Sequence, residues 1–145
     1  MITNYQKQNH VEALINGYAI QVTHFGVGNT GHDPDSPISC LTPDPTLNPN
    51  PTVSGDRLPE DLTFGPKLID SYVVGTDFTP FWTCTLEKGE ATGIISSYYL
   101  FAKFVTVPVL APLLINKLWI FSYSYSPFSV KTDGEKWTLQ MGTRF

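Results

Sequence analysis

The sequence predicts a mostly β protein, an antiparallel β-sandwich with a short N-terminal α-helix and a long proline-rich loop or arm. Polar and apolar residues alternate with a period of two through much of residues 62–145, as expected of strands that bury one face. Seven of the twelve prolines lie between residues 28 and 61, and each lacks the N–H that a regular helix or sheet uses. At 145 residues the chain, residues 1–145, is expected to form a single domain.

The charge content argues against several classes of function. The formal net charge is −4 without any basic run, so no nucleic-acid partner is expected, because phosphate binding requires clustered Lys and Arg. The longest apolar run, residues 105–115, is too short to span a bilayer, and no secretory signal is visible. We therefore expect a chain made in the cytoplasm, with no membrane partner. Charged residues are only 15%, which favours a subunit of an assembly and leaves self-association open.

The first expected element is a helix that Thr3 or Asn4 caps and that ends near Asn16, with Gly17 in the left-handed position after it. A strand over residues 18–27 follows and ends in a glycine-rich stretch. The spacing of those glycines matches neither a Walker loop nor a dinucleotide fingerprint, so we interpret the stretch as a tight turn. The predicted apolar stripe of the helix comprises Val11, Leu14 and Ile15.

Residues 81–102 are the stretch on which the other strands are expected to pack. A strand with alternating faces leads to a polar turn at residues 88–90, and two further strand-like segments continue to residue 104. We expect these segments to form a central β-meander. The apolar run 101–115 is broken by two prolines and is expected to be an edge strand plus loop, or an apolar contact surface. The strand that begins at residue 81 is predicted to bury Trp82, Cys84 and Leu86.

Two more strands are expected in the last third of the chain. Residues 117–125 alternate strongly, and residues 136–145 follow a hairpin-type turn at residues 132–135. In the first of these strands, the predicted aromatic face comprises Trp119, Phe121, Tyr123 and Tyr125. The opposite face comprises Leu118, Ile120, Ser122 and Ser124.

The proline-rich arm, residues 28–61, is expected to be extended and almost without regular structure. It carries six acidic residues against the single Arg57, which favours a basic patch on its partner. A structureless segment of this length in a compact domain is usually functional or disordered. We therefore predict that the arm orders only against a partner subunit. The predicted partner-binding residues are Pro43, Pro45, Leu47, Pro49, Pro51 and Val53.

The sequence offers no recognisable metal site. His24, His32 and Cys40 are spaced unlike the ligands of known zinc sites, and no fourth ligand is obvious. Asp33 and Asp35 resemble the start of a calcium loop, but the alternating ligands and central glycine that such a loop requires do not follow. We expect no metal and no cofactor.

No catalytic constellation can be read from the spacing either. No serine or cysteine nucleophile has a recognisable histidine and acid in a known pattern. Glu87 and Glu90 bracket a turn and are interpreted as exposed turn residues rather than a carboxylate pair. Cys40 and Cys84 are interpreted as free thiols, while a disulfide between them stays open. We expect a protein that is not an enzyme.

Several short motifs occur in an order that resembles a known family. They are VTHFGVGN at residues 22–29, PEDL at 59–62, GIISSYYLF at 93–101, WIFSY at 119–123 and SVK at 129–131. Together with the N-terminal helix, this order is similar to the N-terminal domain of tail-collar fibre and tail-fibre proteins of contractile-tailed phages. The family's acidic-plus-glycine step is replaced here by serine and two tyrosines, and the proline arm is longer.

The resemblance implies a structural virion protein located in a phage tail. In the family this domain docks a fibre onto the baseplate by protein–protein contacts, so the expected partners are other tail, baseplate or fibre subunits. Because no fibre sequence follows before residue 145, we expect a free-standing baseplate subunit or fibre-attachment adaptor.

An alternative hypothesis is a small carbohydrate-binding β-sandwich that recognises host surface glycans through aromatic side chains. The two hypotheses differ in where Trp82, Trp119 and Trp137 lie. Glycan binding favours three indoles exposed together in a groove, whereas a docking protein is expected to have them scattered in the core.

Overall fold

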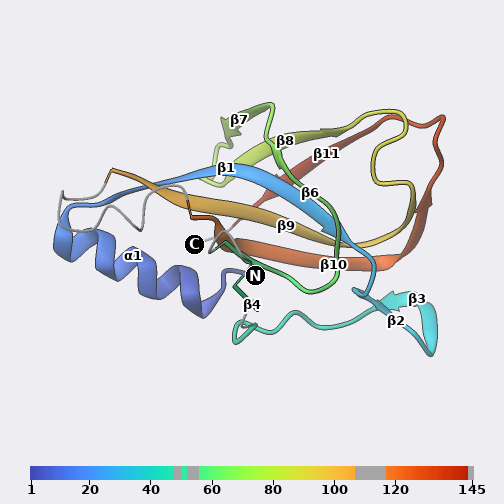
Figure 1. Ribbon diagram of the computed structural model, residues 1–145, viewed down its shortest axis with the longest axis horizontal. Helices are drawn as coiled ribbons and strands as arrows, with labels where there is room; N and C mark the ends of the chain where they lie inside the picture. The colour runs from blue at the N-terminus through green and yellow to red at the C-terminus, as the bar shows by residue number, and fades with distance from the viewer. Residues whose placement is uncertain (48–49, 52–55, 107–116, 144–145) are drawn as a thin grey trace.

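The structure, a computed structural model, describes residues 1–47, 50–51, 56–106 and 117–143. It confirms the predicted fold class, because the chain is mostly β, its paired strands are antiparallel, and it has one short N-terminal helix (Figure 1). The elements are α1 (Asn4–Asn16), β1 (Ala19–Gly28), β2 (His32–Asp33), β3 (Ser36–Cys40), β4 (Asn50–Pro51), β5 (Arg57–Leu58), β6 (Leu62–Leu68), β7 (Ser71–Val74), β8 (Pro80–Leu86), β9 (Gly93–Thr106), β10 (Trp119–Lys131) and β11 (Trp137–Gly142).

Two antiparallel sheets form the body of the molecule. The larger sheet has four strands in the order β10-β9-β1-β6, and the smaller sheet has three in the order β11-β8-β7. We call the face of the larger sheet that is turned toward the smaller one its inner face, and the opposite face its outer face. The core between the sheets includes Val22, Trp82, Cys84, Leu86, Ile95, Leu100, Phe104, Trp119 and Phe121.

The predicted strand around Cys84 is confirmed, but the predicted meander is wrong. Alternating residues of β8 are buried, as expected. However, β8 belongs to the smaller sheet, while β9 lies in the larger sheet between β1 and β10. The polar turn after β8 therefore carries the chain from one sheet to the other. β9 runs unbroken through Ser96 and Ser97, which are buried because this strand has neighbours on both sides. Residues 107–116, most of the predicted edge strand plus loop, lie outside the described residues.

The caps of α1 are confirmed, but its predicted apolar stripe is wrong. The Thr3 hydroxyl accepts a hydrogen bond of 3.1 Å from the Gln6 N–H, and Gly17 takes the left-handed conformation after the last turn. The face that packs on the core carries Gln6, Asn9 and Ala13. The reason lies in the core, where the buried indole N–H of Trp119 needs an acceptor and donates 2.7 Å to Gln6 Oε1. The side chains of Val11, Leu14 and Ile15 consequently face outward.

The predicted faces of β10 are also wrong, because the strand changes phase. The pairing of β10 with β9 shifts register between Ile120 and Ser122, as it does at a β-bulge. Before the shift, Phe121 packs inward against Trp82, with ring centroids 5.9 Å apart. After it, Tyr123 points to the outer face and stacks on Tyr99 at 5.9 Å. The four aromatic residues that the alternation placed on one face are thus divided between two faces.

Candidate docking surface

The described part of the arm lies against the chain's own body. The Tyr123 hydroxyl donates to the carbonyl of Asp44 and accepts from its N–H, and the Asn4 N–H donates 2.8 Å to the carbonyl of Pro45. Farther along, the Arg57 N–H donates 2.7 Å to the Leu118 carbonyl. Figure 1 shows the arm leaving the β2–β3 hairpin at one end of the sheet and passing β4 on its way back.

The structure corrects one expectation about the arm. It contains regular pairing, since β2 pairs with β3 and β4 pairs with β5, because the prolines occupy positions that such short pairings tolerate. Over its described residues the arm packs on its own chain, while its ordering only against a partner subunit stays a prediction. Of the predicted partner-binding residues, Pro43, Pro45 and Leu47 are half-buried on their own chain. Pro51 lies in β4, while Pro49 and Val53 lie outside the described residues.

A small apolar cluster on the outer face explains why the arm docks there. Tyr99, Phe101, Leu118, Ile120 and Tyr123 are buried in it, and leucines of the arm pack over them. Covering these residues removes apolar surface from water, at roughly 25 cal/mol per Å². The arm therefore acts as a third layer over the outer face of the larger sheet.

Asp61 anchors the end of the arm, a role that no motif or spacing in the sequence indicates. Its Oδ1 accepts a 2.5 Å hydrogen bond from the Tyr99 hydroxyl. Its Oδ2 accepts from the hydroxyls of Ser97 at 2.7 Å and Thr30 at 2.9 Å. These donors come from distant parts of the chain, so only the folded sheet brings them together. Burial, and then the Asp61 carboxylate, raise the pKa of the Tyr99 hydroxyl, which keeps it protonated as a donor.

The cavity beside Asp61 has a volume of about 590 Å³ and opens between the arm and Tyr125. Four donors share the Asp61 carboxylate, so its lone pairs are used within the chain. Other acidic groups of the arm are used in the same way. Asp44 accepts from the Thr46 N–H, and Asp56 accepts from the Leu118 N–H. Asp61 and Asp56 thus attach the arm to the body of the protein, whereas Asp44 closes a turn within the arm.

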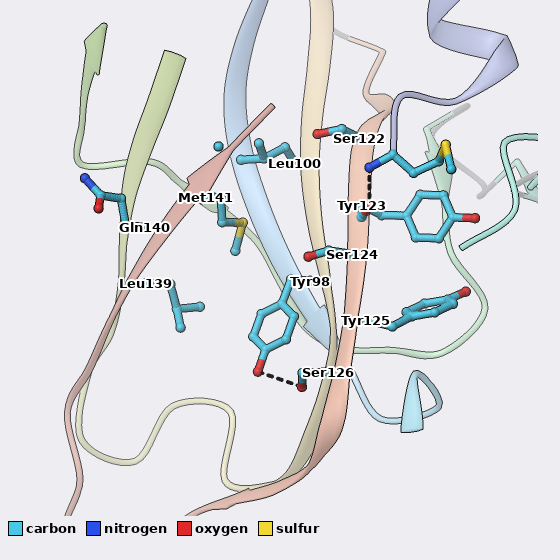
Figure 2. Close-up of a pocket in the computed structure, with 12 residues that line it drawn as sticks. Tyr98, Leu100, Ser122, Tyr123, Ser124, Tyr125, Ser126, Leu139, Gln140 and Met141 are labelled. Atoms are coloured by element: carbon cyan, nitrogen blue, oxygen red, sulfur yellow. Dashed lines mark hydrogen bonds between the residues drawn. The ribbon is translucent and has the colours of Figure 1, made fainter. Parts of the chain in front are cut away.

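A second cavity lies between the sheets where β10 faces β11 (Figure 2). Its volume is about 350 Å³, and serine hydroxyls of β10 face Leu139 and Met141 of β11 across it. The Ser126 hydroxyl donates 3.2 Å to the Tyr98 hydroxyl at its rim. Among the described residues that line it, none has a carboxylate, imidazole or amine side chain. The cavity therefore offers hydrogen bonds, apolar contact and one titratable group, the α-amino group of Met1, whose pKa is lowered by burial.

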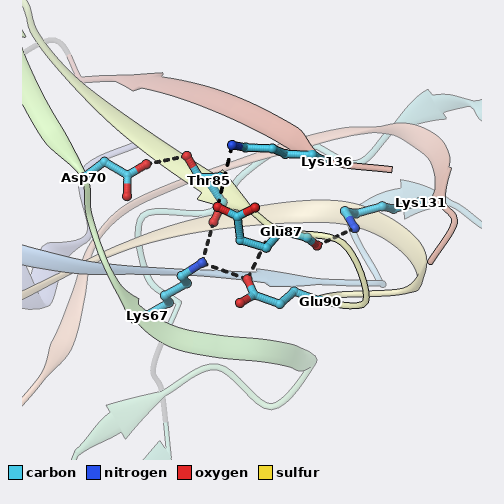
Figure 3. A network of polar contacts seen from close by, with 7 residues as sticks. All are labelled: Lys67, Asp70, Thr85, Glu87, Glu90, Lys131 and Lys136. Carbon is cyan, nitrogen blue, oxygen red and sulfur yellow. Dashed lines mark hydrogen bonds and ion pairs between the residues drawn. The ribbon is translucent and has the colours of Figure 1, made fainter. Parts of the chain in front are cut away.

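The two glutamates that bracket the turn after β8 belong to a polar network (Figure 3). Lys67 of β6 donates 2.8 Å to Glu90 and 3.0 Å to the carbonyl of Thr85, and so ties the larger sheet to the smaller one. The hydrogen bond from Lys67 lowers the pKa of the Glu90 carboxyl. Glu87 is exposed, as expected, and lies 3.7 Å from Lys136, whereas Glu90 is half-buried. Each carboxylate faces a lysine, which is the arrangement of a structural link.

The histidines flank the glycine-rich end of β1 but do not converge. His24 Nδ1 lies 2.7 Å from the Thr23 hydroxyl, and His32 Nδ1 lies 2.9 Å from the Ser96 hydroxyl. Burial lowers the pKa of His24. Cys40 pairs with His32 across the β2–β3 hairpin and is an exposed free thiol, while the buried free thiol of Cys84 has its pKa raised to about 12 by burial. Within the described part of the chain, no three His, Cys, Asp or Glu side chains cluster as metal ligands would.

The tryptophans do not form a shared binding groove. Trp82 and Trp119 are buried in the core, and Trp137 is half-buried beside it. The Trp119 indole N–H is used by Gln6, and the Trp137 indole N–H donates 3.2 Å to Glu135. This placement does not favour the glycan-binding alternative, which rests on indoles exposed together.

Exposed apolar side chains gather instead in two places. The first is the outward face of α1, where Leu14 is 73% exposed and Ile15 is 76% exposed. The second is β7, where Tyr72 is 72% exposed and Val74 is 56% exposed. Isolated exposed apolar residues are ordinary, but contiguous ones mark interaction surfaces. Neither surface was predicted from the sequence, because the apolar stripe of the helix was expected to pack on the core and the alternation of residues 62–145 does not show which strand is an edge.

A groove separates these two features. Its volume is about 520 Å³, and its walls come from α1, the inner face of β1 and the edge of the smaller sheet.

No protein-family model, curated protein or solved structure matches the chain. No helix in the described ranges is long and apolar enough to cross a membrane.

Proposed function

We propose that this chain is a structural protein of a phage tail, a baseplate or fibre-attachment subunit that acts by docking onto other tail proteins. The observation that carries the docking role is the exposed apolar surface of the outward face of α1 and of β7. Its charged fraction of 15% supports the same role, because a weakly charged surface is prone to association. The phage tail is proposed from the order of the short motifs, which resembles the fibre-protein domain.

The proposed docking surface differs from the one that the sequence predicted. The half-buried arm residues Pro43, Pro45 and Leu47 contact their own sheet, so their apolar atoms are partly used. We therefore assign the docking to α1 and β7 rather than to the arm. The proposed role requires no catalytic group, no cofactor and no metal.

The test is made on particles of the phage that encodes the chain. Mass spectrometry of gradient-purified virions is expected to detect the chain as a tail component. A nonsense mutant grown in a non-suppressing host is expected to give particles that lack the baseplate or the fibres in electron micrographs. Purified particles without the chain, together with complete tails in the mutant, would refute the proposal.

A further inference from the structure

The edge strands of the two sheets are protected to different degrees against pairing with a further strand. The β10 edge is covered by the start of the chain, where Ile2 forms a bridge with Ser122. β6 carries Pro66, which has no N–H to donate, and Lys67, and both residues discourage pairing at an edge. β7 is one of the two edges of the smaller sheet, opposite β11, and reads Ser-Tyr-Val-Val, with neither a proline nor a charge. All four of its residues are exposed.

The backbone of β7 has an identifiable set of open hydrogen-bonding groups. The Gly75 N–H donates 2.8 Å to the Thr79 carbonyl, so this pair is a hydrogen-bonded one. Hydrogen-bonded and non-hydrogen-bonded pairs alternate along antiparallel strands. Val74, opposite Pro80, and Tyr72, opposite Trp82, are therefore non-hydrogen-bonded pairs. Their N–H and C=O groups point away from β8, toward the open side of the sheet.

The side chains of the same two residues line the groove beside α1. Tyr72 and Val74 form one wall, Gln6 and His10 of α1 form another, and Ile20 of β1 lies in the floor. The larger sheet has four strands and the smaller has three, so the groove occupies the space that a fourth strand of the smaller sheet would face. A strand added to β7 would satisfy the open backbone groups and place alternate side chains in this groove.

We propose that β7 accepts an extended strand from a different protein, with alternating apolar side chains and Lys or Arg at its ends. The end charges follow from Asp70 and Asp77, two exposed acidic residues that flank β7. A second copy of this chain fits less well, because antiparallel pairing of β7 with itself brings Asp70 of one copy near Asp77 of the other. This inference goes beyond the tail assignment, since strand acceptance by β7 does not depend on the assembly.

The test is a selection of eight-residue peptides from a random displayed library against the folded protein. Enriched peptides are expected to alternate apolar and polar positions and to carry basic ends. The decisive variant is Val74→Pro, which removes an outward N–H and leaves the hydrogen bonds to β8 in place. It is expected to weaken binding of the best peptide about tenfold, as loss of about 1.4 kcal/mol implies. The matched control, Val74→Thr, keeps the N–H and is expected to bind within a few-fold of the wild type.

A second measurement leaves the protein unchanged. N-methylation of alternate residues of the best peptide removes the donors on one edge at a time, and methylation of only one of the two sets should abolish binding. Equal binding by Val74→Pro, equal effects of both methylation sets, or no enriched peptide would overturn the proposal. Dimerisation of the wild-type chain that Val74→Pro abolishes would overturn it too, because the occupant would then be a second copy. None of these outcomes depends on whether the chain is found in a virion.

Discussion

The Tyr99 hydroxyl and the Asp61 carboxylate are joined by a 2.5 Å hydrogen bond that connects the middle of β9 to the end of the arm. Ser97 and Thr30 donate to the same carboxylate, so Asp61 connects β9 with the segment that follows β1. The contact is the point at which the arm rejoins the sheet. Its removal should therefore loosen the arm as well as weaken the fold.

Asp61→Asn is expected to lower the free energy of unfolding by about 1–3 kcal/mol. The amide nitrogen of asparagine would face hydrogen-bond donors at a position where a carboxylate oxygen now accepts from them. Urea denaturation followed by tryptophan fluorescence measures the change. Asp35→Asn is the matched control, since this exposed residue of the arm lies outside the cluster. Equal stability of Asp61→Asn and the wild type would contradict the anchoring role.

Stability is expected to fall above about pH 10. Burial raises the pKa of Tyr99, and it raises that of Tyr123 to about 12 from an ordinary value of 10.0. The unfolded chain then loses phenolic protons before the folded chain does, so the stabilisation is complete below pH 10 and is lost as the pH rises. Urea midpoints measured from pH 8 to pH 11.5 provide the check. Tyr99→Phe should flatten the decline, whereas Phe at the exposed Tyr72 should leave it unchanged.

Thr3→Ala is expected to cost about 1–2 kcal/mol of stability. The buried hydroxyl of Thr3 accepts from the Gln6 N–H and donates 2.8 Å to the Ile120 carbonyl, so alanine removes a helix cap and a tertiary hydrogen bond together. Thr3→Ser keeps the hydroxyl and is expected to retain most of the stability. Thermal unfolding of the three proteins would contradict the assignment if serine and alanine had the same effect.

Replacement of both Leu14 and Ile15 by Gln is expected to change the stability of the isolated protein by no more than about 0.5 kcal/mol. Both side chains are exposed, so their removal opens no cavity. If α1 docks as proposed, the double variant should be incorporated poorly into particles although it folds normally. Ala13→Gln gives the contrast, because Ala13 is buried in the core and overpacking there should cost about 1–3 kcal/mol. A large loss of stability in the Leu14 and Ile15 double variant would show that this face is not free.

Local signals predicted the ends of elements better than their faces. The capping preferences of Thr3 and Gly17 are properties of a few neighbouring residues, so the limits of α1 were predictable. The buried face of α1 was not, because it depends on the acceptor that Trp119 needs from a strand more than a hundred residues later. Hydrophobic periodicity uses only the residues of the helix itself and therefore cannot predict a contact with Trp119.

The prediction of the two faces of β10 was wrong for a related reason. A single register shift after Ile120 exchanges the two faces, and no residue type in the sequence marks it. The arm shows the same limit. Its prolines correctly excluded long strands, but its attachment depends on Tyr99 of β9 and on Tyr123 of β10, and the position of Tyr123 on the outer face follows from that shift. The edge of β7 was missed because an edge is a property of the whole sheet.

The bond from Thr3 to Ile120 also determines when the protein can finish folding as it is made. It spans 117 residues, so α1 leaves the ribosome long before the strand that receives its cap has been synthesised. β1 likewise must wait for β9, its partner in the middle of the larger sheet. Such long-range closure slows folding and prolongs the exposure of apolar segments. Nascent chains of this protein should therefore depend on chaperone protection until β10 has emerged.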